Sequence, residues 1–381
     1  MKIVHIINSL KKGGAEGNLY RLCKIQKKKY KNKIDIIIIT LIDSGYYEYE
    51  LKKKGIKILS LRINEKNKIF DFIKKITKLR KYIKKINPDI IQSWMYHSNF
   101  LTMFIPKKYH NKIFWNIRHS ELNLKISKKM TIFLSIICGL FSRFVPKKII
   151  YCSEKSIKFH ENNQFYSKKK TRLIDNGYSD KIYYPSNNLR SNFRKKNKIK
   201  KTDIILGYAG RYAKQKNIES LLNAFSKIVK NYSNVHLYMV GKEINLQNKE
   251  LINIMSGLNI KDKMVLLNEQ KNLLEFYNGI DLLVLTSHSE SFPNVIAEAM
   301  LCSTPVLASN AGCSKKIIDK YGFVLNKNDY LSITKGLKRS INILENKKGN
   351  WKSLKKNVRS QIKNKFSIEK MAHNYSENWI S

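Results

Sequence analysis

The sequence of 381 residues lacks paired cysteines, a long apolar run and a recognisable leader. Its five cysteines are widely spaced and form no CxxC pair, which argues for a reducing compartment and against disulfides or a structural metal site. The longest apolar run, residues 130–141, is shorter than the roughly 20 residues that a membrane span needs. The opening MKIVHIINSLKKGG has too short an apolar stretch for a signal peptide. We therefore expect a cytoplasmic protein, peripheral at the inner face of the plasma membrane.

Acidic residues are also scarce. The chain has 28 Asp and Glu against 74 Lys and Arg, which gives a net charge of +46. The lysines are spread from Lys2 to Lys370, so a solvated basic surface explains them as well as an anionic partner does. Candidate partners are a membrane surface, nucleic acid or phosphorylated substrates. No zinc knuckle, RNA-binding aromatic strand or helix-turn-helix signature is present, so nucleic acid is not expected.

Short β-branched runs alternate with amphipathic segments along the whole chain. Continuous apolar strands between helices are typical of parallel sheets covered on both faces, which predicts an α/β fold with two doubly wound, Rossmann-like domains. In open parallel sheets ligands lie beyond the carboxyl ends of the strands, so two such domains facing each other would form a cleft. The expected strands are residues 3–7, 34–40, 56–59, 89–93, 113–117, 149–152, 172–174, 203–209, 235–240, 264–267, 282–285, 305–308 and 322–325.

The polarity of the chain also predicts its domain boundaries. Residues 186–202 are polar and basic without hydrophobic periodicity, and we interpret them as a linker. The first domain is then expected at 1–185 and the second at 203–365. A last helical pattern occupies 366–381.

The segment TSHSESFPNVIAEAMLCSTPVLASN, residues 286–310, predicts a strand end, a loop, a helix, a loop and a strand. The Phe-Pro-Asn of 292–294 is typical of a helix start, so the amides of 295–297 are expected to be unpaired and able to bind an anion. Glu290 and Glu298 would place carboxylates, which accept hydrogen bonds from hydroxyls, on either side of that site. An ordinary capped helix with two solvated glutamates is the alternative.

Basic and glycine residues follow two other expected strands. Arg211 and Lys216 lie five residues apart around a loop after a strand, an arrangement that suits a diphosphate. Gly13 and Gly14 follow the first strand, where paired glycines let the backbone approach a ligand and leave helix N–H groups free for phosphate. A plain strand-to-helix turn explains the two glycines equally well.

Two histidines are candidates for catalysis or substrate binding. His119 lies between Arg118 and Ser120 at the end of an expected strand, and His97 follows the strand before it. A histidine at the carboxyl end of a strand can act on a substrate, although a structural hydrogen bond is the alternative.

One apolar segment is flanked by basic residues. Residues 124–148 have an apolar centre, and the basic residues on its flanks are Lys125, Lys128, Lys129, Arg143, Lys147 and Lys148. The segment is either a buried helix of the first domain or a surface that docks on anionic lipid.

With these residues in place, the chain resembles retaining glycosyltransferases of the GT-B fold, glycosyltransferase family 4 (group 1). The resemblance runs nearly end to end. ESFPNVIAE matches the E-x7-E donor motif of that family, and the following AM and TPV fit it too. The other matching residues are the diphosphate-binding Gly210, Arg211 and Lys216, the glycine loop GGAE at 13–16, and Asn176-Gly177.

The resemblance implies a role for each of these residues. Glu298 would bind the nucleotide ribose, and Glu290 would contact hydroxyls of the transferred sugar. Arg211 and Lys216 would hold the diphosphate leaving group, and His119 would lie beside the transferred sugar. No cofactor or metal is implied. The full set of implied donor-binding residues is Gly13, Gly14, Arg211, Lys216, Glu290, Phe292, Pro293, Asn294, Val295 and Glu298, with His97, Arg118 and Ser120 on the acceptor side.

The implied reaction transfers a hexose or N-acetylhexosamine from a nucleotide-diphosphate sugar, expected to be uridine-linked, to a lipid-linked or lipopolysaccharide glycan at the membrane. The last helix would cross back onto the first domain. A GT-B nucleotide-sugar epimerase is the alternative, and a basic nucleic-acid binder a more remote one. Four residues depart from the family pattern without touching the implied catalytic positions: Asp175, Asn268, Ser303 and Lys316.

Overall fold

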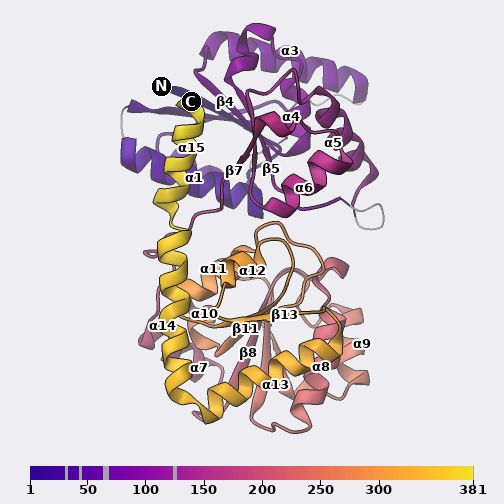
Figure 1. Ribbon diagram of the computed structural model, residues 1–381, viewed down its shortest axis with the longest axis vertical. Helices are drawn as coiled ribbons and strands as arrows, with labels where there is room; N and C mark the ends of the chain where they lie inside the picture. The colour runs from indigo at the N-terminus through magenta and orange to yellow at the C-terminus, as the bar shows by residue number, and fades with distance from the viewer. Residues whose placement is uncertain (31–32, 43–44, 63–67, 123–126, 381) are drawn as a thin grey trace. The chain divides into compact units, whose positions relative to one another are not determined.

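The computed structural model describes residues 1–30, 33–42, 45–62, 68–122 and 127–380 (Figure 1). It divides into two compact units. Unit 1 comprises Met1–Gly177 and Ile368–Ser381, and unit 2 comprises Tyr178–Ser367. Unit 2 therefore begins at Tyr178, whereas the sequence predicted that the first domain would extend to residue 185.

Unit 1 contains a parallel sheet of seven strands among its described residues, in the order β3-β2-β1-β4-β5-β6-β7. Neighbouring residues of β1 point to opposite faces, as the strand pleat requires: Ile3 and Ile7 lie in one core cluster, and Val4 and Ile6 in another. The elements are β1 Lys2–Ile7, α1 Gly14–Tyr30, β2 Asp35–Thr40, α2 Glu48–Lys52, β3 Lys57–Ser60, α3 Lys68–Ile86, β4 Ile90–Trp94, α4 Met95–Thr102, β5 Ile113–Ile117, α5 Lys129–Phe141, β6 Lys148–Tyr151, α6 Glu154–Asn163, β7 Thr171–Leu173 and α15 Ile368–Ile380.

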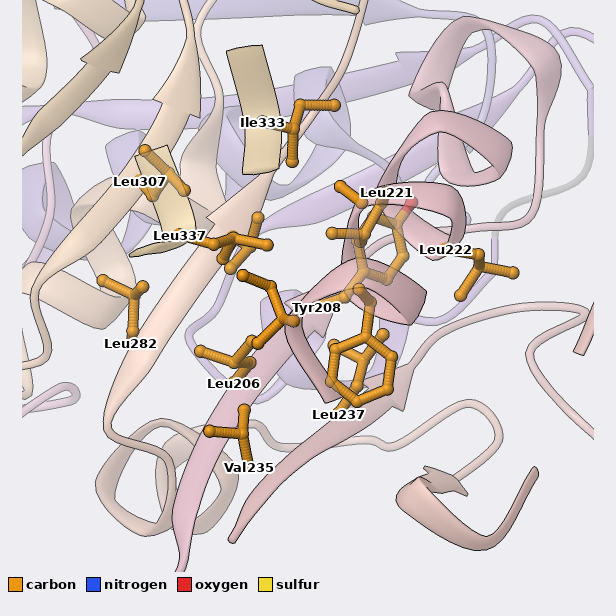
Figure 2. Close-up of a cluster of buried hydrophobic side chains, with 14 of the residues drawn as sticks. Leu206, Tyr208, Leu221, Leu222, Val235, Leu237, Leu282, Leu307, Ile333 and Leu337 are labelled. Carbon is orange, nitrogen blue, oxygen red and sulfur yellow. The ribbon is translucent and has the colours of Figure 1, made fainter. Parts of the chain in front are cut away.

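Unit 2 contains a second parallel sheet, in the order β10-β9-β8-β11-β12-β13. Figure 2 shows one side of its core, where Leu206 of β8 and Leu237 of β9 lie among leucines of the covering helices, such as Leu221 and Leu337. The elements are α7 Asn187–Lys196, β8 Ile204–Ala209, α8 Ile218–Val229, β9 Val235–Val240, α9 Lys249–Gly257, β10 Met264–Leu266, α10 Leu274–Gly279, β11 Leu282–Leu285, α11 Asn294–Leu301, β12 Val306–Ser309, α12 Ser314–Ile318, β13 Phe323–Leu325, α13 Tyr330–Asn346 and α14 Lys348–Lys365.

The predicted fold class, two doubly wound α/β domains, is confirmed by these sheets. Both ends of every expected strand lie within one residue of the observed ends. Buried β-branched runs explain this agreement, because a strand covered on both faces is apolar throughout its length.

The predicted linker at 186–202 is wrong for most of its length. It contains α7, which belongs to unit 2. Phe193 of α7 is 5% exposed and packs edge-on against Phe276, in the space that Gly279 leaves open. Arg190 pairs with Asp281 at 2.6 Å. Because Phe193 is the only buried residue of α7, the helix has no apolar stripe that a sequence pattern could reveal.

The last helix, α15, belongs to unit 1 and lies beside α1 (Figure 1). The Trp379 indole donates to the side-chain carbonyl of Gln92 at 3.0 Å, and the Asn116 amide donates to the Tyr375 hydroxyl at 2.6 Å. Within the described ranges, no helix has both the length and the apolarity needed to span a membrane.

Candidate active site

The loops after β8, β11, β12 and β13 lie at one edge of the unit 2 sheet and are hydrogen-bonded to one another. The Thr286 hydroxyl donates to the carbonyl of Lys216 at 3.1 Å, and the Asn328 amide donates to the carbonyl of Thr286 at 2.7 Å. The Ser309 hydroxyl donates to the carbonyl of Ser287 at 2.6 Å. This is the edge where open parallel sheets bind ligands.

Lys216 and Glu290 form an ion pair in these loops. The ammonium nitrogen of Lys216 lies 2.5 Å from Oε1 of Glu290, and both side chains are 14% exposed. The Ser287 hydroxyl donates to the same carboxylate oxygen at 2.7 Å. The two loops are also joined by their backbones, because the His288 amide donates to the carbonyl of Gln215 at 2.8 Å. The largely buried ammonium of Lys216 and carboxylate of Glu290 are thus held at fixed positions.

Arg211 follows β8 on a turn that only glycine permits. The Gly210 amide donates to the carbonyl of Val240 at 2.9 Å. Gly241 has a φ of +151°, and a Cβ there would lie 1.9 Å from the Gly210 carbonyl oxygen. This close approach fixes the turn, while the Arg211 side chain is exposed and can reach a ligand.

The loop at 290–294 leads into α11, as predicted, but one amide there is not free. The Ile296 amide donates to the carbonyl of Pro293 at 3.1 Å, because the first turn of the helix is tight. Gly312 supports the loop from behind: its φ is +56°, and a Cβ there would lie 2.0 Å from the carbonyl oxygen of Glu290. Phe292 is buried and Val295 lies in the first turn of the helix.

Glu298 lies in the middle of α11 and is 8% exposed. The Tyr277 hydroxyl donates to its Oε2 at 2.9 Å. Burial, and after it the charge of Glu298, raises the pKa of Tyr277 well above 10, so this hydroxyl remains a donor. Glu298 is therefore a carboxylate with a fixed orientation.

In unit 1, His119 lies beside a network of hydrogen bonds between Tyr96, His160 and Ser156. Its ring stacks on Tyr96 with centroids 5.4 Å apart, and the Ser156 hydroxyl donates to its carbonyl at 2.5 Å. The Tyr96 hydroxyl lies 2.7 Å from Nε2 of His160, whose Nδ1 lies 2.7 Å from the Ser156 carbonyl. A carbonyl can only accept, so Nδ1 of His160 carries the proton and Nε2 accepts from Tyr96.

Both histidines are neutral at neutral pH. Burial lowers the pKa of His119 to about 4 and that of His160 to about 4. His119 can therefore form hydrogen bonds to a substrate but does not offer it a positive charge. His97 lies nearby on α4 and is exposed.

Arg118, predicted on the acceptor side, has several partners within unit 1. Its guanidinium donates to the Asn176 side chain and to the Tyr375 hydroxyl, and it lies over the Trp94 ring at 5.1 Å. It thus ties α15 to the edge of the sheet. No sequence pattern indicates these contacts, because Tyr375 lies 257 positions away. Ser120 is buried.

The glycine loop leads into α1, which begins at Gly14. A Cβ at Gly13 would lie 2.3 Å from Oε2 of Glu16, so glycine makes room for this carboxylate in the first turn. Burial raises the pKa of Glu16, and a hydrogen bond from its own backbone amide partly offsets the shift. A carboxylate therefore occupies part of the helix start that the sequence predicted to be free for phosphate.

The structure thus brings Lys216 and Glu290 together in unit 2, and Arg211 and the 292–298 segment belong to the same unit. Gly13, Gly14, His97 and His119 belong to unit 1. Sequence reasoning missed Ser287, Ser309, Asn328 and Tyr277, because serines, asparagines and an apolar-flanked tyrosine carry no distinctive pattern. Among the described residues, no three His, Cys, Asp or Glu side chains lie close enough to hold a metal ion.

Comparison with known proteins agrees with this architecture. The family model "Glycosyl transferases group 1" matches residues 190–379. The chain is 22% identical to the O-antigen biosynthesis glycosyltransferase WclY of Escherichia coli, over 98% of this chain and 97% of WclY. It is 25% identical to the capsular polysaccharide biosynthesis glycosyltransferase CapM of Staphylococcus aureus, an alignment that spans 65% of each protein.

Solved structures show the same fold. The Anabaena Alr3699/HepE structure in complex with UDP and glucose superposes with a TM-score of 0.80, at 19% identity over 99% of this chain and 98% of that one. WaaG, a glycosyltransferase involved in lipopolysaccharide biosynthesis, superposes with a TM-score of 0.75, at 13% identity over 98% of each chain. The chain is therefore a glycosyltransferase with the GT-B fold. The C-terminal part of the chain, residues 190–379, is similar to the group 1 glycosyltransferases.

The buried histidines predict that acid destabilises unit 1. The pKa of His119 and of His160 is about 4 in the fold and 6.5 ordinarily, so the unfolded chain takes up protons first. Their contribution to stability is complete above pH 6.5 and is lost as the pH falls towards 4. Each residue changes the free energy of unfolding by up to about 1.4 kcal/mol per pH unit.

Urea unfolding followed by tryptophan fluorescence measures this dependence. A Trp351→Phe background leaves only Trp94, Trp115 and Trp379, which all belong to unit 1. His160→Gln removes one titrating group and should flatten the slope by up to about 1.4 kcal/mol per pH unit. An unchanged slope would show that His160 is not buried as described.

Proposed function

We propose that this chain is a retaining glycosyltransferase of family 4. It moves a hexose or N-acetylhexosamine from a UDP-linked donor to a lipid-linked or lipopolysaccharide glycan. The observation that carries this proposal is the ion pair of Lys216 and Glu290 at the carboxyl edge of the unit 2 sheet, where Glu290 lies in the loop that precedes α11. The names of its relatives, in capsular polysaccharide and O-antigen biosynthesis, support the acceptor class. The UDP in the HepE complexes supports the nucleotide.

Arg211 and Lys216 bind the diphosphate in this proposal. An ammonium has three donors and Lys216 gives one of them to Glu290, so the others can reach phosphate oxygens. The exposed Arg211 adds a forked pair of donors. Negative charge builds on the diphosphate as the glycosidic bond breaks, and the two cations stabilise it without a metal or cofactor.

The carboxylates bind hydroxyls. Glu290 accepts from Lys216 and Ser287 on one oxygen, Oε1, which leaves capacity for sugar hydroxyls. Glu298 accepts from Tyr277 on Oε2, and we assign it to the ribose. His119, being neutral, is proposed to contact the transferred sugar by hydrogen bonding only.

The surface of α5 supports membrane association. One face of this helix, with Leu134 and Cys138, is buried in the unit 1 core. The other exposes Met130, Phe133 and Leu140. Helix α5 is therefore buried on one face, while its other face is open to a partner. Residues 124–126 lie outside the described part of the chain. Phe144, 73% exposed, continues the apolar surface, and the flanking basic residues are Lys128, Lys129, Arg143, Lys147 and Lys148. We propose that this surface docks on anionic lipid.

The epimerase alternative has no support among the relatives named above. Incubation with UDP-GlcNAc in the absence of acceptor distinguishes the two reactions. A transferase releases at most UDP and free sugar, whereas an epimerised UDP-sugar would overturn the proposal.

Arg211→Ala and Glu298→Ala test the donor site. Loss of the Arg211 fork removes charge stabilisation of the leaving group and should lower the transfer rate by about 10²-fold. Glu298→Ala should raise the KM for the donor. Arg339→Ala, an exposed arginine on α13, is the matched control and should leave transfer unchanged. Transfer and donor hydrolysis that both survive in the Arg211→Ala, Glu298→Ala double variant would rule out this site.

Phe133→Ser with Phe144→Ser tests the membrane surface. Sedimentation with vesicles of phosphatidylcholine and phosphatidylglycerol should show about tenfold weaker binding for the double variant, because two large apolar contacts are lost. Leu246→Ser with Leu331→Ser removes equally exposed apolar residues from unit 2 and should have no effect. Equal binding by the two double variants would contradict the assignment of α5.

A further inference from the structure

Helix α11 carries Glu298 and follows the loop of the proposed donor site. Both of its ends are hydrogen-bonded to residues that lie outside the motifs named so far. We propose that Tyr178 and Arg359 are positioning residues for the nucleoside diphosphate of the donor: Tyr178 fixes the first turn of α11 and Arg359 fixes the last. The proposal rests on the proposed function and names two further residues on which donor binding depends.

Tyr178 holds the start of the helix. Its hydroxyl donates to the side-chain oxygen of Asn294, the first residue of α11. Its ring stacks on Phe292 with centroids 6.2 Å apart and an angle of 28° between the planes. Phe292 also packs against Phe366, with ring centroids 5.7 Å apart and an angle of 73° between the planes. The donor loop is thus enclosed by two rings from distant parts of the chain.

Tyr178 itself is fixed by its backbone. Its amide donates to the carbonyl of Phe366 at 2.9 Å, and it forms a parallel bridge with Ser367. Tyr178 and Ser367 are the first and last residues of unit 2, so both connections to unit 1 leave unit 2 at this point. Tyr178 is 2% exposed, and its hydroxyl has little freedom to leave Asn294.

Arg359 holds the end of the helix. Its guanidinium donates to the carbonyl of Leu301, the last residue of α11, and to the carbonyl of Tyr183 at 3.3 Å. It also donates to the carbonyl of Asp180 at 3.4 Å. The last carbonyls of a helix lack partners within the helix, and a cation there is favourable. One side chain of α14 thereby joins α11 to the 180–183 segment.

The two contacts together determine where Glu298 lies. The helix has 8 residues and so spans about 12 Å, and a body this short moves as a unit. Displacement of a binding group by about 1 Å is enough to weaken a site strongly. With both ends fixed, Glu298 and the loop at 290–294 keep their mutual geometry.

Tyr178→Phe is the direct test, because it removes one hydroxyl and keeps the ring contacts. The probe is whichever of UDP, GDP and ADP raises the melting temperature of the wild type most. Calorimetric titration should show about threefold to tenfold weaker binding, the effect of one lost hydrogen bond. The KM for the donor should rise by the same factor while the acceptor KM stays unchanged, and loss of the buried hydrogen bond should lower the melting temperature of the unbound protein slightly. Tyr330→Phe, at an exposed tyrosine of α13, is the control.

A double-mutant cycle shows whether Tyr178 acts through Asn294. In an Asn294→Ala background the hydroxyl has lost its acceptor, so Tyr178→Phe should cause no further loss of affinity. Purely structural damage would add to the effect of Asn294→Ala instead, and would overturn the proposal.

Arg359→Gln tests the other end of α11, with Lys363→Gln as its control. The ammonium nitrogen of Lys363 lies 3.0 Å from the Asp180 carboxylate, which also lies 4.0 Å from the Arg359 guanidinium. No hydrogen bond or ion pair joins Lys363 to the described residues of α11. Of these two variants, Arg359→Gln should weaken nucleotide binding and Lys363→Gln should not. If Arg359→Gln unfolds, Tyr178→Phe still tests the inference. Wild-type affinity in both Tyr178→Phe and Arg359→Gln would overturn this inference and leave the proposed function intact. A wild type that binds none of the three nucleotides would overturn both.

Discussion

The ion pair between Lys216 and Glu290 is the interaction on which the proposed donor site depends. Two opposite charges, each 14% exposed, stay together only where other groups hold the loops that carry them. Ser287 bonds the carboxylate, and Thr286 bonds the carbonyl of Lys216. These residues follow β8 and β11, which are neighbours in the sheet, and so the parallel fold itself brings the charges together.

The surroundings of the pair are rigid for reasons that extend through unit 2. Gly241 and Gly312 let backbones approach more closely than any side chain would allow, and each supports one loop of the site. Helix α11 is bonded at its first and last residues by Tyr178 and Arg359. The charges that would meet a diphosphate are therefore oriented before it arrives, which is what electrostatic stabilisation of a leaving group requires.

The sequence predicted the strands well, and it also predicted the loop and helix that carry Glu290 and Glu298, because both features are expressed in adjacent residues. A buried strand is a short apolar run, and Glu290 and Glu298 lie on one loop and helix. Contacts between distant residues could not be predicted, since Tyr178 meets Asn294 across 116 positions and Arg118 meets Tyr375 across 257. Helix α7 was not predicted because it buries a single phenylalanine. The hydrogen bond of the Ile296 amide was not predicted because a tight first turn depends on local geometry.

Lys216 is proposed to bind the donor diphosphate, and calorimetric titration of UDP into the Lys216→Met variant measures its contribution. Lys214→Met, two positions earlier and exposed, is the control for loss of one positive charge in the same loop. Loss of charge-assisted hydrogen bonds should weaken UDP binding by at least about tenfold in Lys216→Met alone. Equal affinity in Lys216→Met and the wild type would contradict this account of the site.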